Sequence, residues 1–191
     1  MNENVRKITR LGMLAALSVA LAALVHFPLM PAAAYLEYDP ADIPILISAF
    51  LYGPWYGVAI TAVVSLVQGL TVSAAGGPIG IIMHIVSTGA VCLVSGYIYK
   101  THRSIKGARI SLLAGVLVMC AVMARMNYLL TPLYTGMPRE QVAQMLIPII
   151  IPFNLIKASI NALLTYLVYK PIRRFLDRID GRRAHAAEKQ G

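Results

Sequence analysis

Six apolar segments separated by short polar stretches constrain this chain more than any other feature. A helix needs about 20 apolar residues to cross a bilayer, and most segments approach that length: 8–28, 42–52, 54–72, 78–99, 109–131 and 145–169. Charged residues make up only 13% of the 191 residues, whereas soluble domains carry about 25%. This excludes a disordered chain, a disulfide scaffold and an ordinary water-soluble enzyme. We predict an all-α integral membrane protein with a single domain, residues 1–191.

The basic residues predict how these segments are oriented. Fourteen of the 17 lie within the first ten residues, within residues 100–109, or in the tail 170–191. Cytoplasmic loops carry excess Lys and Arg, so we place both termini and the central loop inside. That placement needs an even number of crossings before the loop. The short segment 42–52 therefore counts as a span, Gly53-Pro54 is a cytoplasmic turn, and the chain has six transmembrane helices.

The net charge of +9 has two interpretations. In a soluble protein it would indicate nucleic-acid binding, but the clustering favours topology and attraction to lipid headgroups, with no nucleic-acid partner. Cys92 and Cys120 both lie within apolar segments and lack metal-ligand spacing, so we expect neither a disulfide nor a metal site.

The two ends of the chain need separate treatment. The basic start, the apolar run and Ala32-Ala33-Ala34 resemble a signal peptide with its cleavage site, yet the run is longer than a usual signal core, so we expect a retained helix. After Pro171 we expect a short, basic, amphipathic stretch that frays.

Enzyme motifs are absent from the sequence. It contains no GxxxxGK[ST] loop for ATP, no HExxH, and LVSG rather than GxSG at residues 93–96. No catalytic residue is predicted. An intramembrane enzyme remains the alternative from a different functional class.

The first segment carries a stripe of small residues, Gly12, Ala16 and Ala20, at a spacing of four. Small residues allow close approach of another helix in lipid. The stripe therefore indicates either packing inside the bundle or a docking face for a separate membrane subunit.

The last segment places Asn154, Lys157 and Asn161 on one helical face. A lysine at this depth is costly unless it faces protein or a wet cavity. One interpretation is a structural lysine paired with a carbonyl group; the other, which we favour, is a polar cavity open to the outer half of the membrane. Pro148 and Pro152 should loosen the helix just upstream.

Further polar residues are expected at the same depth. They are Arg125, Asn127 and Tyr128 in the fifth segment, His84 in the fourth, and Gln68 in the third. Arg125 could instead pair with an acid of the outer loop 29–41, that is Glu37, Asp39 or Asp42 at its border. Tyr35 and Tyr38 in that loop could cover the cavity.

Four stretches resemble one known family. YLEYDPADIP, FLYGPWYGVAI, MNYLLTP and IPFNLIKA are similar, in this order, to stretches of the substrate-binding S components of energy-coupling factor (ECF) vitamin transporters, and in particular of the riboflavin-specific members. The resemblance runs from about Arg10 to Lys170.

The resemblance implies roles for residues already singled out. It implies that Asn127, Asn154 and Lys157 contact the vitamin, that Leu36, Tyr38 and Asp39 form a lid, and that the small-residue stripe contacts a coupling subunit. The complete set expected at the ligand is Leu36, Tyr38, Asp39, His84, Asn127, Tyr128, Asn154 and Lys157. Glu37 and His84 differ from the residues usual in the family, so FMN, another vitamin or a queuosine precursor stays open as the ligand.

The resemblance also implies partners and a location. It implies riboflavin as transported ligand rather than cofactor, one transmembrane coupling subunit, and two ATPase subunits that alone bind ATP. The expected location is the cytoplasmic membrane of a prokaryote, with the chain crossing the bilayer several times.

Overall fold

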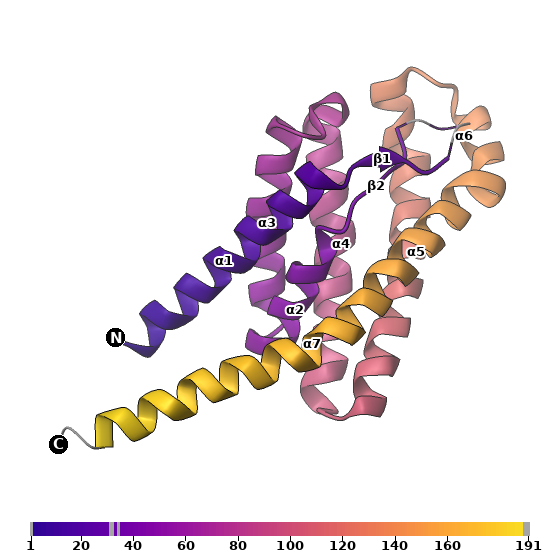
Figure 1. Cartoon of the computed structure of the whole chain (residues 1–191). Coiled ribbons are helices and arrows are strands. Elements are labelled where there is room, and N and C mark those ends of the chain that lie inside the picture. The colour runs from indigo at the N-terminus through magenta and orange to yellow at the C-terminus, as the bar shows by residue number, and fades with distance from the viewer. Residues whose placement is uncertain (1, 31–32, 34, 189–191) are drawn as a thin grey trace.

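The computed structural model describes residues 2–30, 33 and 35–188, and this part of the chain is almost entirely helical (Figure 1). The main helices are α1 (Glu3–Leu24), α2 (Asp42–Tyr52), α3 (Pro54–Leu70), α4 (Gly77–Thr101), α5 (Ile105–Thr135), α6 (Arg139–Met145) and α7 (Ile151–Glu188). Both termini lie on the same side of the molecule, away from the strands and α6 (Figure 1). Two residues of the considered cleavage site, Ala32 and Ala34, lie outside the described part.

The centre of the bundle is α2, which contacts α1, α3, α4 and α7. Every residue from Asp42 to Phe50 is buried. The helix ends at Gly53, whose φ of 114° suits glycine rather than a residue with a side chain. Pro54 then occupies the first turn of α3, where its missing N–H leaves no bond unmade. The predicted turn between the second and third helices therefore forms as an abrupt reversal.

The described part of the loop between α1 and α2 contains regular structure. Strands β1 (Phe27–Pro28) and β2 (Glu37–Tyr38) pair antiparallel, with Phe27 opposite Tyr38. The preceding helix α1 begins at Glu3 and ends at Leu24, whereas the expected segment was 8–28. The described residues between Leu24 and Asp42 are called the strap below, and they lie at the same end of the bundle as α6 (Figure 1).

The ends of α5 and α7 differ from expectation. The sequence TPLYT was expected in a polar loop, but α5 continues through Pro132 to Thr135 and ends at Gly136 with φ 74°. The tail was expected to fray after Pro171, yet α7 continues through this proline to Glu188. Each proline removes only one backbone hydrogen bond. Pro132 lies in the last turn of α5, with a long helical stretch before it, and Pro171 has long helical stretches on both sides, so each helix tolerates the loss.

A wider turn interrupts the entry to the last helix. Residues Leu146–Ile150 form the π-helical segment η2 around Pro148, between α6 and α7. A short 3-10 turn, η1 (Ala74–Gly76), similarly leads from α3 into α4. The helices long and apolar enough to span a membrane lie within Glu3–Leu24, Ala74–Thr101, Ile105–Thr135 and Arg139–Leu176, whereas α2 and α3 are shorter apolar helices.

Candidate functional site: a polar cavity beside the strap

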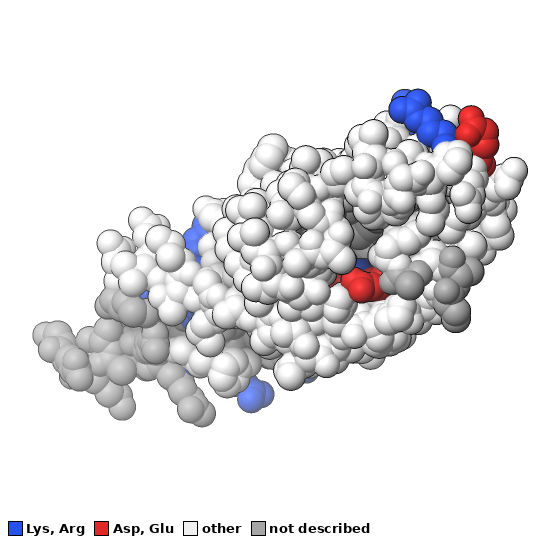
Figure 2. All heavy atoms as spheres, turned by 90° about the horizontal axis from the view of Figure 1, so that it is seen from above, with Lys and Arg blue, Asp and Glu red and all other residues white. Residues whose placement is uncertain are grey.

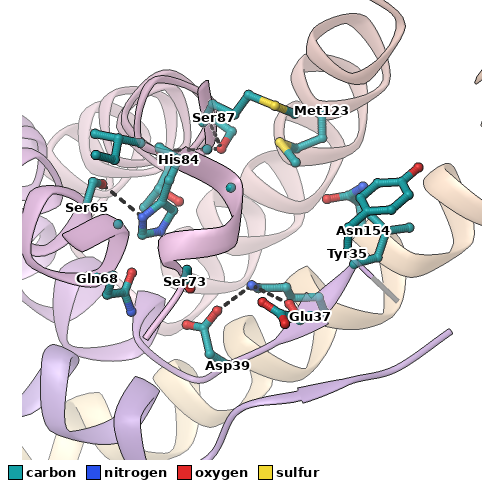
Figure 3. A pocket seen from close by; sticks show the side chains of 18 of the residues that line it. Tyr35, Glu37, Asp39, Ser65, Gln68, Ser73, His84, Ser87, Met123 and Asn154 are labelled. Carbon is teal, nitrogen blue, oxygen red and sulfur yellow. Dashed lines mark hydrogen bonds and ion pairs between the residues drawn. The ribbon is translucent and has the colours of Figure 1, made fainter. Parts of the chain in front are cut away.

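A cavity of about 220 Å³ lies at the end of the bundle that carries the strap. The strap, α3, α4, α5 and α7 all contribute to its walls, and the side chains that point into it are shown in Figure 3. Seen from above, carboxylates lie beside a hollow in a surface that is otherwise mostly uncharged (Figure 2). Of the expected ligand residues, the cavity brings together Leu36, Asp39, His84, Asn127, Asn154 and Lys157.

Lys157 ties the strap to α7. Its Nζ lies 2.7 Å from Asp39 Oδ2 and donates to the Glu37 carbonyl oxygen at 3.1 Å (Figure 3). The lysine and the Asp39 side chain are 17% and 14% exposed, so the pair is largely removed from solvent. Lys157 is therefore paired with a carbonyl group, as the first interpretation states, and it also lines the cavity.

Asn161 strengthens the same attachment one turn further along α7. Its Nδ2 donates to the Asp39 carbonyl oxygen at 3.2 Å, and its Oδ1 accepts from the Tyr38 hydroxyl at 3.2 Å. Tyr38 also packs its ring against Phe27, with centroids 5.5 Å apart. Tyr38 was expected at the ligand, but it does not line the cavity. In a strand, adjacent side chains point to opposite faces, so Tyr38 faces away from the side that Asp39 and Glu37 present.

A second polar network surrounds Asp42 at the start of α2. Asp42 Oδ1 accepts from Thr88 Oγ1 at 2.9 Å and lies 3.2 Å from His84 Nε2. The other ring nitrogen, His84 Nδ1, lies 2.9 Å from Ser65 Oγ. His84 thus has a partner on each ring nitrogen and occupies a fixed orientation at the cavity wall (Figure 3).

Three carboxamides retain hydrogen-bonding capacity toward the cavity. Asn127 Nδ2 donates to Met123 O and its Oδ1 accepts from Thr131, which leaves one donor. Asn154 Nδ2 donates to Ile150 O, and no described residue donates to its Oδ1. The Gln68 side chain makes no hydrogen bond to any described residue, although the residue is only 5% exposed. These groups can bind a polar ligand without first breaking the fold.

Aromatic and sulfur-containing side chains complete the walls. Tyr35 and Tyr134 meet edge to face, with centroids 6.1 Å apart. Burial raises the pKa of the Tyr35 hydroxyl to about 12, so this phenol stays neutral at physiological pH. Met119, Met123 and Phe153 add apolar surface. A flat, partly apolar molecule with neutral polar groups matches this combination of walls.

Two further expected residues, besides Tyr38, do not line the cavity. Tyr128 is 36% exposed and outside the cavity, because successive helical residues point about 100° apart and Asn127 already faces inward. Arg125 is also exposed. The acids considered as its partners bind elsewhere: Asp39 to Lys157, Asp42 to His84, and Glu37 to His26 at 2.7 Å.

Several residues of the cavity had no sequence signal strong enough to single them out. They are Ser65, Ser87, Thr88, Met119, Met123, Tyr134 and Phe153. Serine, threonine and methionine are common in transmembrane helices for packing reasons, so composition alone does not distinguish them. Among the described residues, no group of His, Cys, Asp and Glu is arranged to hold a metal ion.

The small-residue stripe of α1 lies outside the bundle. Gly12, Ala16 and Ala20 are all exposed, and a side-chain carbon added at Gly12 would meet nothing within 4 Å. Packing inside the bundle, one of the two interpretations of this stripe, is therefore wrong for this chain.

The chain is similar to known proteins along nearly its whole length. It is 32% identical over 94% of its length to the riboflavin transporter RibU of Staphylococcus aureus (strain TCH60), of which it covers 96%. It is 28% identical over 91% of its length to the riboflavin transporter FmnP of Bacillus subtilis (strain 168), of which it covers 95%.

Structural similarity points the same way. A solved S component of a bacterial ECF transporter superposes with a TM-score of 0.78 at 28% identity, over 91% of this chain and 99% of that one. The family model described as "ECF transporter, substrate-specific component" matches residues 6–169. The chain therefore belongs to the family of ECF transporter substrate-specific components, and it is a transporter component rather than an enzyme.

Proposed function

We propose that this protein binds riboflavin in the outer cavity and serves as the S component of a riboflavin uptake system. The observation that carries the proposal is the cavity itself, because it combines unused carboxamide groups with apolar and aromatic walls. The curated relatives named as riboflavin transporters support the same ligand. Riboflavin has a flat tricyclic ring and a neutral polyhydroxyl tail, which such a cavity suits.

In this proposal, each part of the ligand has a matching wall. The ring lies against the apolar surface of Met119, Met123 and Phe153, and the hydroxyl groups bind Asn127 and Asn154. Lys157 donates to the tail while it keeps its attachment to the strap. Leu36 and Asp39 close the cavity as a lid from the strap side. Gln68 is an additional contact, since its carboxamide is free within the described structure.

The transport step requires partners. We propose a transmembrane coupling subunit that contacts the exposed stripe Gly12, Ala16 and Ala20, together with two ATPase subunits. The chain lacks an ATP-binding motif of its own. The proposed location is the cytoplasmic membrane of a bacterium.

We propose six spans with both termini in the cytoplasm, and labelling tests this topology. Thr101 and Arg139 lie at opposite ends of α5 and its adjoining turns. In a chain with Cys92 and Cys120 changed to Ala, we expect a membrane-impermeant maleimide to label Arg139→Cys in intact cells and Thr101→Cys only after permeabilisation. Labelling of both positions in intact cells would contradict the model.

Flavin binding tests the proposed ligand. The purified protein in detergent should quench the fluorescence of added riboflavin on binding. Lys157→Met keeps the side-chain length and removes the donors, so we expect affinity to fall up to roughly a hundredfold, equivalent to about 1–3 kcal/mol for a lost buried partner. The matched control is Lys100→Met, which changes an exposed lysine at the opposite end of the bundle.

The result separates the alternatives. An unchanged dissociation constant in a folded Lys157→Met variant would remove this lysine from the site. Tighter binding of FMN than of riboflavin would identify the phosphorylated flavin as ligand. No binding of any flavin by the parent protein would reject the flavin proposal and leave another vitamin or a queuosine precursor to be tested.

A further inference from the structure

A second cavity, of about 300 Å³, lies at the end of the bundle opposite to the strap. Its walls come from the end of α4, the loop that follows, the start of α5 and the middle of α7. None of its lining residues belongs to the outer cavity. Under the topology proposed above, on which this inference rests, the second cavity opens at the cytoplasmic face of the membrane.

The floor of this cavity is a rigid aromatic cluster. Phe50 and Tyr99 stack with centroids 4.5 Å apart, and Tyr169 meets both rings edge to face, at 5.5 Å and 5.4 Å. All three residues are almost fully buried, with 5–6% exposed. Ala108 and Leu112 of α5 extend this apolar floor toward the membrane interior.

The rim of the cavity is strongly basic. Arg103, Lys170, Arg173 and Arg174 line it, and the lining includes no acidic residue. No carboxylate among the described side chains forms an ion pair with any of these four. Four cations held around one hollow repel one another unless an anion lies between them.

Arg173 is held in place by neutral groups. Its Nη1 donates to the hydroxyls of Tyr99 and Tyr169, each at 3.4 Å. These phenols orient the guanidinium without neutralising it, and the remaining N–H groups stay available. A planar guanidinium is well suited to bind two oxygens of a phosphate group at once.

A neighbouring cavity of about 190 Å³ shares this cationic wall. Arg103, Arg173, Phe50 and Tyr169 line both cavities, so the two arginines stand between them. The apolar surface nearby continues along α5 and α7, where Leu113 and Leu167 are 65% and 56% exposed. A ligand with an anionic head and an apolar body fits the basic rim and the adjoining lipid-facing surface together.

We propose that this basic, aromatic-floored cavity is a binding site for a phosphate group, supplied by the headgroup of an anionic phospholipid of the cytoplasmic leaflet. The headgroup phosphate lies between Arg103 and Arg173, and the glycerol and acyl chains lie along the exposed apolar surface of α5 and α7. Basic pockets between helices on this side of a membrane are suited to anionic headgroups. A soluble phosphate would use the same cationic groups but would gain nothing from the apolar surface.

Titration of the full-length protein in neutral detergent tests the site. The ligands are dioctanoyl phosphatidylglycerol, dioctanoyl phosphatidylcholine and inorganic phosphate, with affinity measured by calorimetry. We expect the parent to bind the phosphatidylglycerol at least roughly tenfold more tightly than the other two, since charge-assisted hydrogen bonds to phosphate are the strong ones. Equal affinity for both lipids would overturn the proposal. Inorganic phosphate binding as tightly as phosphatidylglycerol would keep the phosphate site and reject its lipid source.

Two double variants that each remove two positive charges distinguish binding in the cavity from non-specific electrostatic attraction of the lipid to the basic surface. Arg103→Gln/Arg173→Gln removes the shared wall, whereas Lys106→Gln/Arg178→Gln removes two exposed cations that line neither cavity. We expect the first pair to weaken phosphatidylglycerol binding roughly tenfold and the second less than about twofold. Equal weakening by both pairs would show that only net charge matters and would overturn the proposal.

A conservative variant shows whether weaker binding is a direct effect or results from misfolding. Arg173→Lys keeps the charge but not the planar fork, so we expect binding to weaken by roughly threefold while the thermal midpoint in detergent is retained. Unchanged binding in both Arg173→Lys and the folded double variant would contradict the site. No step of this experiment uses riboflavin, so failure here leaves the flavin proposal unaffected, and the reverse also holds.

Discussion

Helices α1 and α2 are both apolar and lie against each other, yet their surroundings are opposite. Only Ser18 and Ala22 are buried among the 22 residues of α1, whereas nine of the 11 residues of α2 are buried. In lipid, no hydrophobic force drives an apolar helix into the protein interior, so packing and polar contacts decide which helix is enclosed. The bundle therefore folds with α1 exposed at its surface, and the small residues of α1 stay accessible to a partner. Helix α2, in contrast, is enclosed by α1, α3, α4 and α7.

The largest expected effect comes from placing a tryptophan in each helix, because only the enclosed helix α2 lacks room for it. Ala49 in α2 is 1% exposed, and a side-chain carbon built at Gly57 of α3 would lie only 2.7 Å from Ala49 Cβ. Ala49→Trp would force α2 and α3 apart, and overpacking of this size destabilises a core by more than the usual 1–3 kcal/mol or so for added methylenes. We expect no monodisperse protein after detergent extraction, measured by size-exclusion chromatography. The exposed position Ala16 provides the matched control, and aggregation of Ala16→Trp as well would contradict the contrast.

The second prediction concerns transport. Ala16 lies at the middle of the exposed stripe, where an indole ring would hold a partner helix away. We expect Ala16→Trp to bind riboflavin with an affinity within about twofold of the parent and to abolish uptake into vesicles that contain the coupling and ATPase subunits. Leu17→Trp is the control, because Leu17 is also exposed but points about 100° away from Ala16 around α1, and this variant should transport normally. Retained uptake by Ala16→Trp would exclude the stripe as the docking surface.

The smallest expected effect distinguishes two buried serines. Ser18 Oγ in α1 has no hydrogen-bond partner among the described residues, whereas Ser48 Oγ in α2 donates to Ile45 O at 2.6 Å. We expect Ser18→Ala to leave the free energy of unfolding unchanged or raise it slightly, and Ser48→Ala to lower it by about 0.5–1.5 kcal/mol, the usual net value of one hydrogen bond. Thermal unfolding in detergent measures both. A larger loss at Ser18 than at Ser48 would reverse the comparison between the helices.

The sequence could predict much of the helical framework because the relevant signals are local. Gly53 and Pro54 mark the reversal between α2 and α3, and the apolar runs mark the helices. The ends of α5 and α7 were harder to predict from the sequence, because Pro132 and Pro171 are strong local signals for helix termination. The surrounding helix overrides each proline because it supplies the remaining hydrogen bonds.

For the candidate site, the sequence could predict which residues share a face of one helix, but not which face is turned toward the cavity. Spacing along α7 places Asn154 and Lys157 on one face, and both line the cavity. Tyr128 follows Asn127 directly in sequence, and only knowledge of which face of α5 is turned inward separates the two. Gln68 was expected at the depth of the cavity and does line it, but the sequence could not show that its carboxamide has no hydrogen-bond partner among the described residues.

The sequence by itself determined that this chain is a helical membrane protein whose basic residues cluster in three regions, because composition, hydropathy and charge clustering are properties of the chain alone. Only the tertiary structure decided how charges are paired. Lys157 binds Asp39 across 118 residues, and Asp42 meets Thr88 across 46. Such contacts depend on the folding back of the strap and on the rotation of each helix about its axis, and helical periodicity fixes the relative angles along one helix but not the direction in which that helix faces its neighbours.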